Sequence, residues 1–108
     1  MKVIIHKMEY IKCFWKYIDD ETPILMFYEL NLDEERYATR IIDIFPDSHI
    51  EKLEDKINIF VSEAPCPTVQ EINKMGEFKA FIISKQDFEK IWSNSNCKYQ
   101  GSLEFPTD

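Results

Sequence analysis

Apolar and polar residues alternate early in the chain with the two-residue period of a β-strand. In the stretch 8–18, Cys13 and Trp15 fall on one face, while Lys12 and Lys16 fall on the other. This period is typical of a strand that keeps one face partly in water. A nearly continuous apolar run with β-favouring aromatics predicts a central strand at 24–30, and further strands are expected at 37–45, 48–53 and 57–61. Turn residues separate these segments, which favours consecutive hairpins and an antiparallel meander.

Two helices are predicted from capping signals. Thr68 stands three residues before Glu71, the spacing by which a hydroxyl and a carboxylate cap a helix start reciprocally, and this predicts a short helix over 69–75. Ser84 and Asp87 repeat the pattern before a helix over 85–93, whose apolar residues recur at the spacing that docks a helix on a sheet. A short strand at 78–83 is expected at a sheet edge, and alternation in 99–105 suggests another edge strand.

These elements predict an α+β fold. We expect a single domain over residues 1–108, with an antiparallel meander of four to six strands and two helices packed on one side of it. The length suits one hydrophobic core and no more. Fifteen aromatic residues (14% of the chain) and 44% apolar content favour a folded core over disorder.

Charge narrows the choice of partner. The chain has 20 acidic and 13 basic residues, a formal net charge of −7. Such a surface repels nucleic acid and attracts a basic protein. Much of the excess sits in two predicted turns, where the default interpretation is solvated turn charge and the alternative is a phosphate mimic that faces a partner's lysines and arginines. The acidic candidates for partner binding are Asp19, Asp20, Glu21, Asp33 and Glu34.

The sequence gives little support to catalysis or metal binding. His6 and His49 are the only histidines, and they are interpreted as surface or packing residues. The acidic triplets lack the alternating ligands and central glycine of a calcium loop, so neither a metal nor a cofactor is expected. Cys13, Cys66 and Cys97 include no C-x-x-C pair and are expected to be reduced thiols. No stretch resembles a signal peptide or a membrane span, which predicts a cytoplasmic protein.

The remaining conspicuous side chains are arginines and large aromatics. Arg36 and Arg40 are expected to bridge strand-face carboxylates such as Glu29 or Asp43. Large amphipathic rings dominate binding hot spots, so two tyrosines are candidate partner-binding anchors. Those two are Tyr17 and Tyr28, whereas Trp15 and Trp92 are expected in the core.

Short motifs between Trp15 and Trp92 add a family resemblance. They are Glu35-Arg36-Tyr37, Arg40, Ile42-Asp43-Ile44-Phe45 and Asp47, then Glu63-Ala64-Pro65, Pro67, Glu71-Ile72-Asn73, Glu77-Phe78, Ile83-Ser84, Phe88-Glu89 and Trp92. In this order and spacing they resemble a small family of bacterial proteins catalogued as a domain of unknown function. The resemblance implies a gene neighbour that encodes a polymorphic or contact-dependent toxin. It therefore implies an immunity protein of a contact-dependent inhibition system, and it brings no catalytic residues.

The combined expectation is a monomeric, non-enzymatic immunity protein. It would neutralise the C-terminal domain of a cognate basic toxin, such as a secreted ribonuclease, in a 1:1 complex by covering its active site or nucleic-acid surface. Two alternatives stay open. One is a small enzyme or ligand-binding domain with a pocket between sheet and helix, using His49 or Cys66, and the other is an interaction module with no toxin partner.

Overall fold

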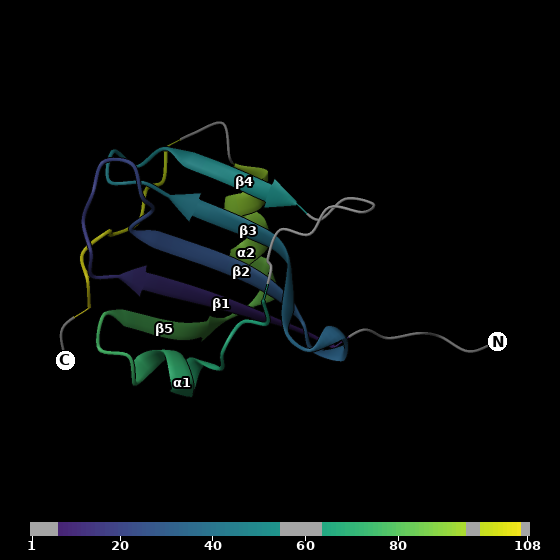
Figure 1. Cartoon of the computed structure of the whole chain (residues 1–108). Helices are drawn as coiled ribbons and strands as arrows, with labels where there is room; N and C mark the ends of the chain where they lie inside the picture. The colour runs from purple at the N-terminus through teal and green to yellow at the C-terminus, as the bar shows by residue number, and fades with distance from the viewer. Residues whose placement is uncertain (1–6, 55–63, 95–97, 107–108) are drawn as a thin grey trace.

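The fold is built on a five-stranded antiparallel sheet. The computed structural model describes residues 7–54, 64–94 and 98–106. Within them the strand order is β4-β3-β2-β1-β5, so the first four strands form the expected meander and the last strand returns beside the first (Figure 1). The strands are β1 (Met8–Trp15), β2 (Leu25–Asn31), β3 (Tyr37–Ile44), β4 (Ile50–Glu54) and β5 (Phe78–Ile83). The strand expected at 57–61 lies outside the described residues.

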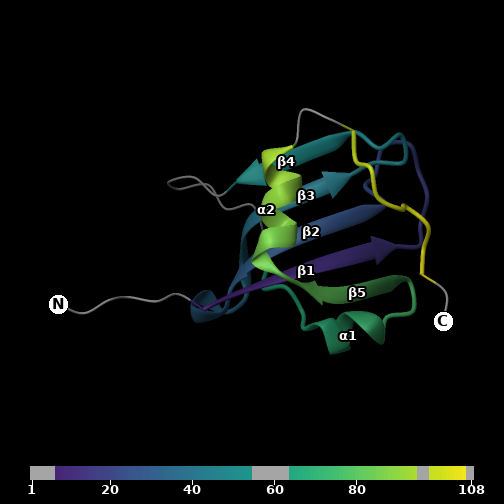
Figure 2. The same cartoon turned by 180° about the vertical axis from the view of Figure 1, so that it is seen from behind.

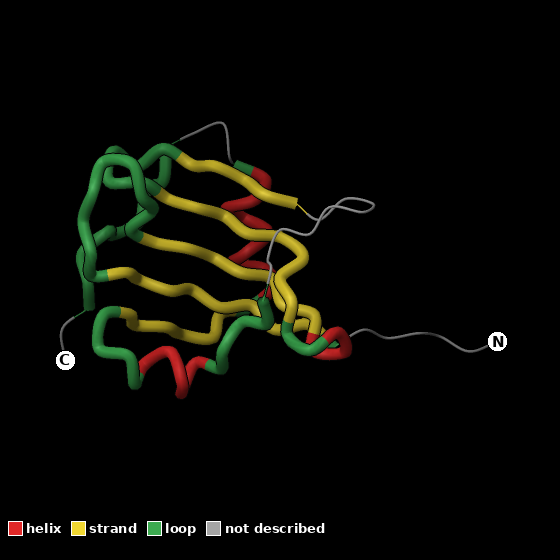
Figure 3. Tube along the Cα trace, viewed as in Figure 1, coloured by secondary structure: helices red, strands yellow, loops and turns green. Residues whose placement is uncertain are grey.

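Connections between the strands gather at two opposite ends of the sheet (Figure 3). The β1–β2 loop and the β3–β4 turn lie at one end, and the 3-10 turn η1 (Leu32–Glu34) lies at the other, between β2 and β3. Four consecutive antiparallel strands impose this arrangement, because every second connection returns to the same end.

Helix α2 (Lys85–Ser93) crosses one side of the sheet, called here the back face (Figure 2). Its buried Phe88 joins a cluster formed by inward side chains of β1, β2 and β3. The buried members of that cluster are Tyr10, Phe14, Leu25, Phe27, Ile42, Ile44 and Phe88. The apolar stripe that predicted a docking helix is therefore confirmed.

Helix α1 (Val69–Asn73) belongs to the other side, called here the front face. Its one buried residue, Ile72, packs in a second cluster with Ile11, Cys13, Met26, Ile41 and Ala80. The expectation that both helices cover the same side is therefore wrong. The physical reason is that α1 is only five residues long and leads directly into the edge strand β5, so it covers that edge of the front face alone.

The two helices begin as their sequences predict. Thr68 accepts a hydrogen bond from the backbone N–H of Glu71 and the Glu71 carboxylate accepts one from the N–H of Thr68, which completes a capping box. Ser84 Oγ accepts from the N–H of Asp87 at 3.0 Å. Gly76, at φ 77°, then turns the chain from α1 into β5 in a conformation that glycine adopts without steric cost.

The side chain of Asn73 covers the outer edge of β5. Its oxygen accepts from the Ala80 N–H at 2.6 Å, and its Nδ2 donates to the Ala80 carbonyl at 3.1 Å. An edge strand otherwise offers such groups to a neighbouring molecule. Helix α1 thus satisfies backbone groups that the sheet leaves unpaired.

Residues 98–106 do not form the predicted edge strand. They run along the back face beside the strand ends (Figure 2), where Tyr99, Leu103 and Phe105 pack against the back cluster. The Tyr99 N–H bonds to the Ser48 carbonyl at 2.9 Å, which ties this segment to the β3–β4 turn. The alternation of apolar residues in this segment therefore reflects side chains that contact the core, and not pairing with a neighbouring strand.

Candidate functional site

The two acidic turns lie at opposite ends of the sheet. Asp19, Asp20 and Glu21 are in the β1–β2 loop, whereas Asp33 and Glu34 are in η1. Seven residues of β2 separate the two ends, about 23 Å at 3.3 Å per residue. A partner that touches both turns must lie along a whole face of the sheet.

Two of the predicted partner-binding carboxylates accept hydrogen bonds from other parts of the chain or from their own loop. Asp19 accepts hydrogen bonds from the N–H of Glu21 at 2.8 Å and from the hydroxyl of Tyr17 at 3.2 Å. Asp33 accepts from the N–H of Lys7 at 3.0 Å. Asp20, Glu21 and Glu34 are exposed. Asp19 and Asp33 therefore have structural partners within the free protein, and their role toward a partner stays a prediction.

The two predicted tyrosine anchors differ in exposure. Tyr17 is 53% exposed, and its ring centroid lies 5.6 Å from that of Trp15. Tyr28 is half-buried on the front face, and its hydroxyl donates to the sulfur of Met26 at 3.2 Å. Burial raises the pKa of Tyr28, and the nearby Cys13 and Asp43 raise it further. Tyr28 is thus a neutral residue on the front face of the sheet, whereas Tyr17 projects from the β1–β2 end.

Tyr28 lines an apolar hollow of about 370 Å³ on the front face. The sheet supplies its floor, and α1 with the preceding segment 64–67 supplies one wall. We call this the front hollow, and its lining is Cys13, Trp15, Met26, Tyr28, Ala64, Pro65, Cys66, Pro67, Ile72, Met75 and Phe78.

An acidic pair beside this hollow was not among the sequence candidates. Asp43 on β3 and Glu51 on β4 are direct cross-strand partners, and Asp43 also pairs with Met26 of β2. Burial raises the pKa of Asp43 to about 6, and the charge of Glu51 contributes to that rise. Like charges placed opposite each other destabilise a sheet. The free protein therefore carries an unfavourable cluster of negative charge at this point.

The prediction that an arginine bridges Asp43 is wrong. No ion pair to Asp43 occurs within residues 7–54, 64–94 and 98–106. Arg40 lies on the back face because it alternates with Ile42 and Ile44, which point to that side, and there it is the cross-strand partner of Glu29. Two features of the sequence could have identified the acidic pair. Asp43 stands between Ile42 and Ile44, which assigns it to the opposite face, and the 45–49 turn sets Glu51 across from it.

The other expected bridge is confirmed. Arg40 donates to both carboxylate oxygens of Glu29, at 2.9 and 2.6 Å, and also pairs with Glu89 of α2. Burial alone would raise the pKa of Glu29, but hydrogen bonds from Arg40, Thr39 and Tyr10 outweigh it and hold the pKa below its ordinary value. The guanidinium also lies 4.7 Å from the ring centroid of Trp92. This network fixes α2 to the sheet.

Arg36 fastens the wall of the front hollow. Its Nε donates to the Cys66 carbonyl at 2.9 Å and its Nη2 to the Pro67 carbonyl at 3.1 Å, while Nη1 pairs with Glu9 at 2.7 Å. Glu35 and Arg36 both have positive φ, at 54° and 67°, a backbone conformation that disfavours ordinary side chains. The short motifs of the resemblance thus include the side chains that fasten α1, α2 and segment 64–67.

The two groups named for an enzyme, Cys66 and His49, have different surroundings. Burial raises the pKa of Cys66, and it raises the pKa of Cys13 to about 12. A reactive cysteine needs the opposite shift, because the thiolate is the nucleophile. His49 stacks on Phe45 with ring centroids 4.3 Å apart and pairs with Asp47 at 2.5 Å, which raises the pKa of His49. Among the described residues, no group of three His, Cys, Asp or Glu side chains is placed to hold a metal ion.

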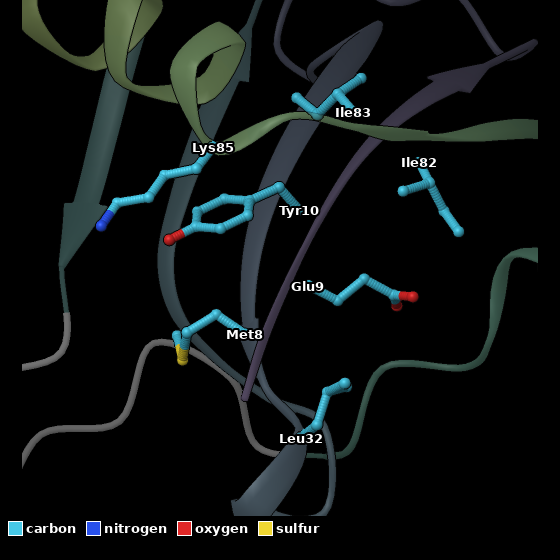
Figure 4. Close-up of a pocket in the computed structure, with 7 residues that line it drawn as sticks. All are labelled: Met8, Glu9, Tyr10, Leu32, Ile82, Ile83 and Lys85. Carbon is cyan, nitrogen blue, oxygen red and sulfur yellow. The ribbon is translucent and has the colours of Figure 1, made fainter. Parts of the chain in front are cut away.

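A second hollow, of about 600 Å³, lies where β5 ends beside β1 (Figure 4). Tyr10, Met8 and Lys85 lie on one side of β1, and Glu9, Leu32 and Ile82 lie on the other. This hollow therefore wraps around a strand edge. Two of its polar groups already have partners, since the hydroxyl of Tyr10 donates to Glu29 at 2.9 Å and Glu9 pairs with Arg36. The front hollow with its adjoining acidic pair is the better candidate site.

Comparison with known proteins assigns a family. The sequence profile of a domain of unknown function, DUF6881, matches residues 9–97. The chain belongs to the DUF6881 family. No curated protein and no solved structure matches this DUF6881 chain. Among the described residues, no helix has the length and apolar character needed to cross a membrane.

Proposed function

We propose that this DUF6881 protein binds and neutralises a basic protein, and that the partner is the C-terminal domain of a toxin encoded beside it. In this role it is an immunity protein of a contact-dependent inhibition system, and the toxin is a nuclease whose cationic surface binds phosphates. The protein acts as a monomer in the cytoplasm, in a 1:1 complex.

The observation that carries the proposal is the pairing of Asp43 with Glu51. The two carboxylates face each other across β3 and β4 beside an apolar hollow, with no Lys or Arg ion pair to either among the described residues; His49 Nε2 lies 3.4 Å from the Glu51 carboxylate. A lysine or arginine from a partner would relieve their repulsion on binding. Because this relief exists only in the complex, it contributes to affinity rather than to the stability of the free protein.

The distribution of acidic residues supports the same surface. The β1–β2 loop with Asp20 and Glu21 lies at the sheet end that also carries the β3–β4 turn, which leads into Glu51. Together with a net charge of −7, this cluster would steer a cationic partner toward the front face. Exposed ion pairs add only about 0–1 kcal/mol each, so tight binding also needs apolar contacts, and Tyr17 and the front hollow supply candidates.

The experiment is a binding and inhibition assay with the C-terminal domain of the neighbouring toxin. Purified protein should capture that domain and stop its cleavage of RNA or DNA at one molecule per toxin. The variant Asp43→Asn/Glu51→Gln should weaken inhibition by roughly tenfold, because about 1.4 kcal/mol of charge complementarity is lost. Glu104→Gln, an exposed change in the C-terminal segment, is the matched control.

Two outcomes would contradict the proposal. One is full toxin activity in the presence of excess protein, and the other is inhibition unchanged by the double variant at every salt concentration. Turnover of a small molecule by the protein alone would instead support the enzymatic alternative.

A further inference from the structure

We infer that the front hollow receives one apolar side chain of the basic partner, presented by a segment with lysine or arginine next to it. This inference rests on the proposed function and specifies how the partner is recognised. The front hollow and the acidic pair then act as one composite site, with an apolar subsite and an anionic subsite side by side.

The front hollow has the lining of an anchor pocket. Trp15 and Phe78 stack at its side with ring centroids 5.6 Å apart and an angle of 18° between the rings. Met26 and Met75 also line it, and methionine adapts its shape to different apolar occupants. None of its lining residues is charged. An aliphatic or aromatic side chain is therefore the occupant that its chemistry favours.

Charge complementarity identifies which protein would supply that side chain. Met26 lines the front hollow and is the cross-strand partner of Asp43, which in turn pairs with Glu51. The anionic subsite therefore begins one strand away from the apolar subsite. A segment with an apolar residue and a neighbouring lysine or arginine matches both subsites at once, whereas an acidic or uncharged segment matches only one.

One polar group in the lining has no partner. The indole nitrogen of Trp15 is buried, and it makes no hydrogen bond within the described part of the chain. A buried donor without an acceptor costs about 1–3 kcal/mol. A peptide carbonyl of an occupying segment that reaches this nitrogen would supply the missing acceptor, which favours a peptide over a hydrocarbon ligand.

The wall of the front hollow is held in place before binding. The backbone of Cys66 is bonded to Arg36 on both sides, because its N–H donates to the Arg36 carbonyl at 3.0 Å and its carbonyl accepts from the Arg36 side chain at 2.9 Å. Pro65 and Pro67 restrict the backbone on either side of Cys66. A wall that is already ordered loses little entropy when it is occupied, so even a short segment can bind.

The test is NMR titration of the ¹⁵N-labelled full chain with capped tripeptides. Acetyl-Arg-Phe-Arg-amide should shift the indole N–H signal of Trp15 and the backbone signals of Met26 and Asp43, and leave the Trp92 indole signal in place. Acetyl-Arg-Gly-Arg-amide should bind roughly tenfold more weakly, since burial of a phenyl ring contributes about 1.5–3 kcal/mol. Acetyl-Glu-Phe-Glu-amide should bind more weakly than both.

Two variants distinguish occupation of the front hollow from non-specific binding of the peptide. Met75 is 50% exposed at its rim, and Met75→Trp should obstruct it and abolish the advantage of the phenylalanine peptide. Ile82→Trp changes an exposed residue of β5 that does not line the front hollow, and it should leave the advantage intact. Far-ultraviolet circular dichroism of both variants checks that they fold.

The outcomes distinguish this inference from the proposed function. Equal binding of the phenylalanine and glycine peptides overturns the apolar subsite. So does a Met75→Trp variant in which the phenylalanine peptide still shifts the Trp15 and Met26 signals as it does in wild type. Either result leaves capture of the toxin domain, measured separately, as the test of the proposed function. Dependence of the same Trp15 and Met26 signals on protein concentration, without peptide, would instead assign the front hollow to a second copy of this chain and overturn the inference.

Discussion

Asp43 and Glu51 face each other directly across β3 and β4. Asp43 is half-buried and lies between Glu51 on one side and Met26 of β2 on the other. The pair makes the free protein less stable than it would be with a neutral residue at either position. Its effect on stability is therefore measurable before any partner is identified.

The first prediction concerns pH. The pKa of Asp43 is raised from its ordinary 3.8 to about 6, so the folded state holds this proton more tightly than the unfolded state does. The contribution of Asp43 to the free energy of unfolding must then fall as pH rises through that interval. The free energy of unfolding of Asp43→Asn, relative to that of wild type, should be about 1 kcal/mol greater at pH 7.5 than at pH 4, after allowance for solvent screening.

Urea unfolding of both proteins at the two pH values measures this difference. Asp20→Asn, an exposed change in the β1–β2 loop, is the control and should show no such pH dependence. A gap that stays constant from pH 4 to 7.5 would mean that Asp43 is not the perturbed group.

The second prediction concerns the Arg40 network. Arg40→Met leaves the buried carboxylate of Glu29 without its cation, and the free energy of unfolding should fall by about 3 kcal/mol. Adding Glu29→Gln should recover part of that loss, because no charge then remains buried. Denaturant unfolding of the two single variants and the double variant measures the coupling, and simple additivity of the two losses would contradict it.

The third prediction concerns the outer edge of β5. Asn73→Ala removes both hydrogen bonds to the backbone of Ala80, and it should lower the free energy of unfolding by about 1–3 kcal/mol. Amide exchange at Ala80 should accelerate in the same variant. Gln70→Ala, an exposed change in the same helix, should alter neither quantity. Unchanged exchange at Ala80 would show that another group protects this edge.

The fourth prediction separates the two acidic turns. Glu21→Lys alters the end of the sheet nearer Glu51, whereas Glu34→Lys makes the same change of charge at the opposite end. If the front face at the first end receives the partner, the first variant should slow association with the toxin domain more and reduce its salt dependence more. Stopped-flow rates over a range of salt concentrations measure both effects, and a larger effect of Glu34→Lys would place the contact at the η1 end.

The fifth prediction concerns the thiols. With its pKa near 12, Cys13 has roughly a thousandfold less thiolate at pH 8 than an ordinary cysteine. Iodoacetamide should therefore leave Cys13 unmodified in the folded protein and modify it rapidly in urea, as peptide mass spectrometry would show. Rapid modification of Cys13 in the folded state would contradict its burial.

Local patterns in the sequence were sufficient to predict most of the elements. The period of two gave β1 to β4, and the Thr68–Glu71 and Ser84–Asp87 spacings gave both helix starts because capping depends on neighbouring residues alone. The side of the sheet that α1 covers depends on how Ile72 meets side chains more than thirty residues away, which no local period reports. The edge strand predicted at 99–105 was wrong for the same reason. Alternation of Tyr99, Leu103 and Phe105 does not distinguish a paired strand from an extended segment that lies on the core.

The candidate site was harder to predict. Charge composition and exposed turns pointed to an acidic surface, but the pairing of Asp43 with Glu51 depends on register between strands. Alternation along β3 places Arg40 with Ile42 and Ile44 on the back face and Asp43 on the front face, so Asp43 does not receive the arginine that proximity in sequence suggested. The front hollow combines β1, β2, β5 and segment 64–67, so it exists only once the chain is folded.

The segment that carries Tyr99, Leu103 and Phe105 lies beyond the last residue matched by the family profile, which is residue 97. An expression fragment trimmed to the profile boundary would therefore uncover the apolar surface around Phe27, whose ring centroid lies 5.9 Å from that of Tyr99. Such a fragment should be prone to aggregate, and a purification tag at this end should follow residue 108 rather than replace the segment.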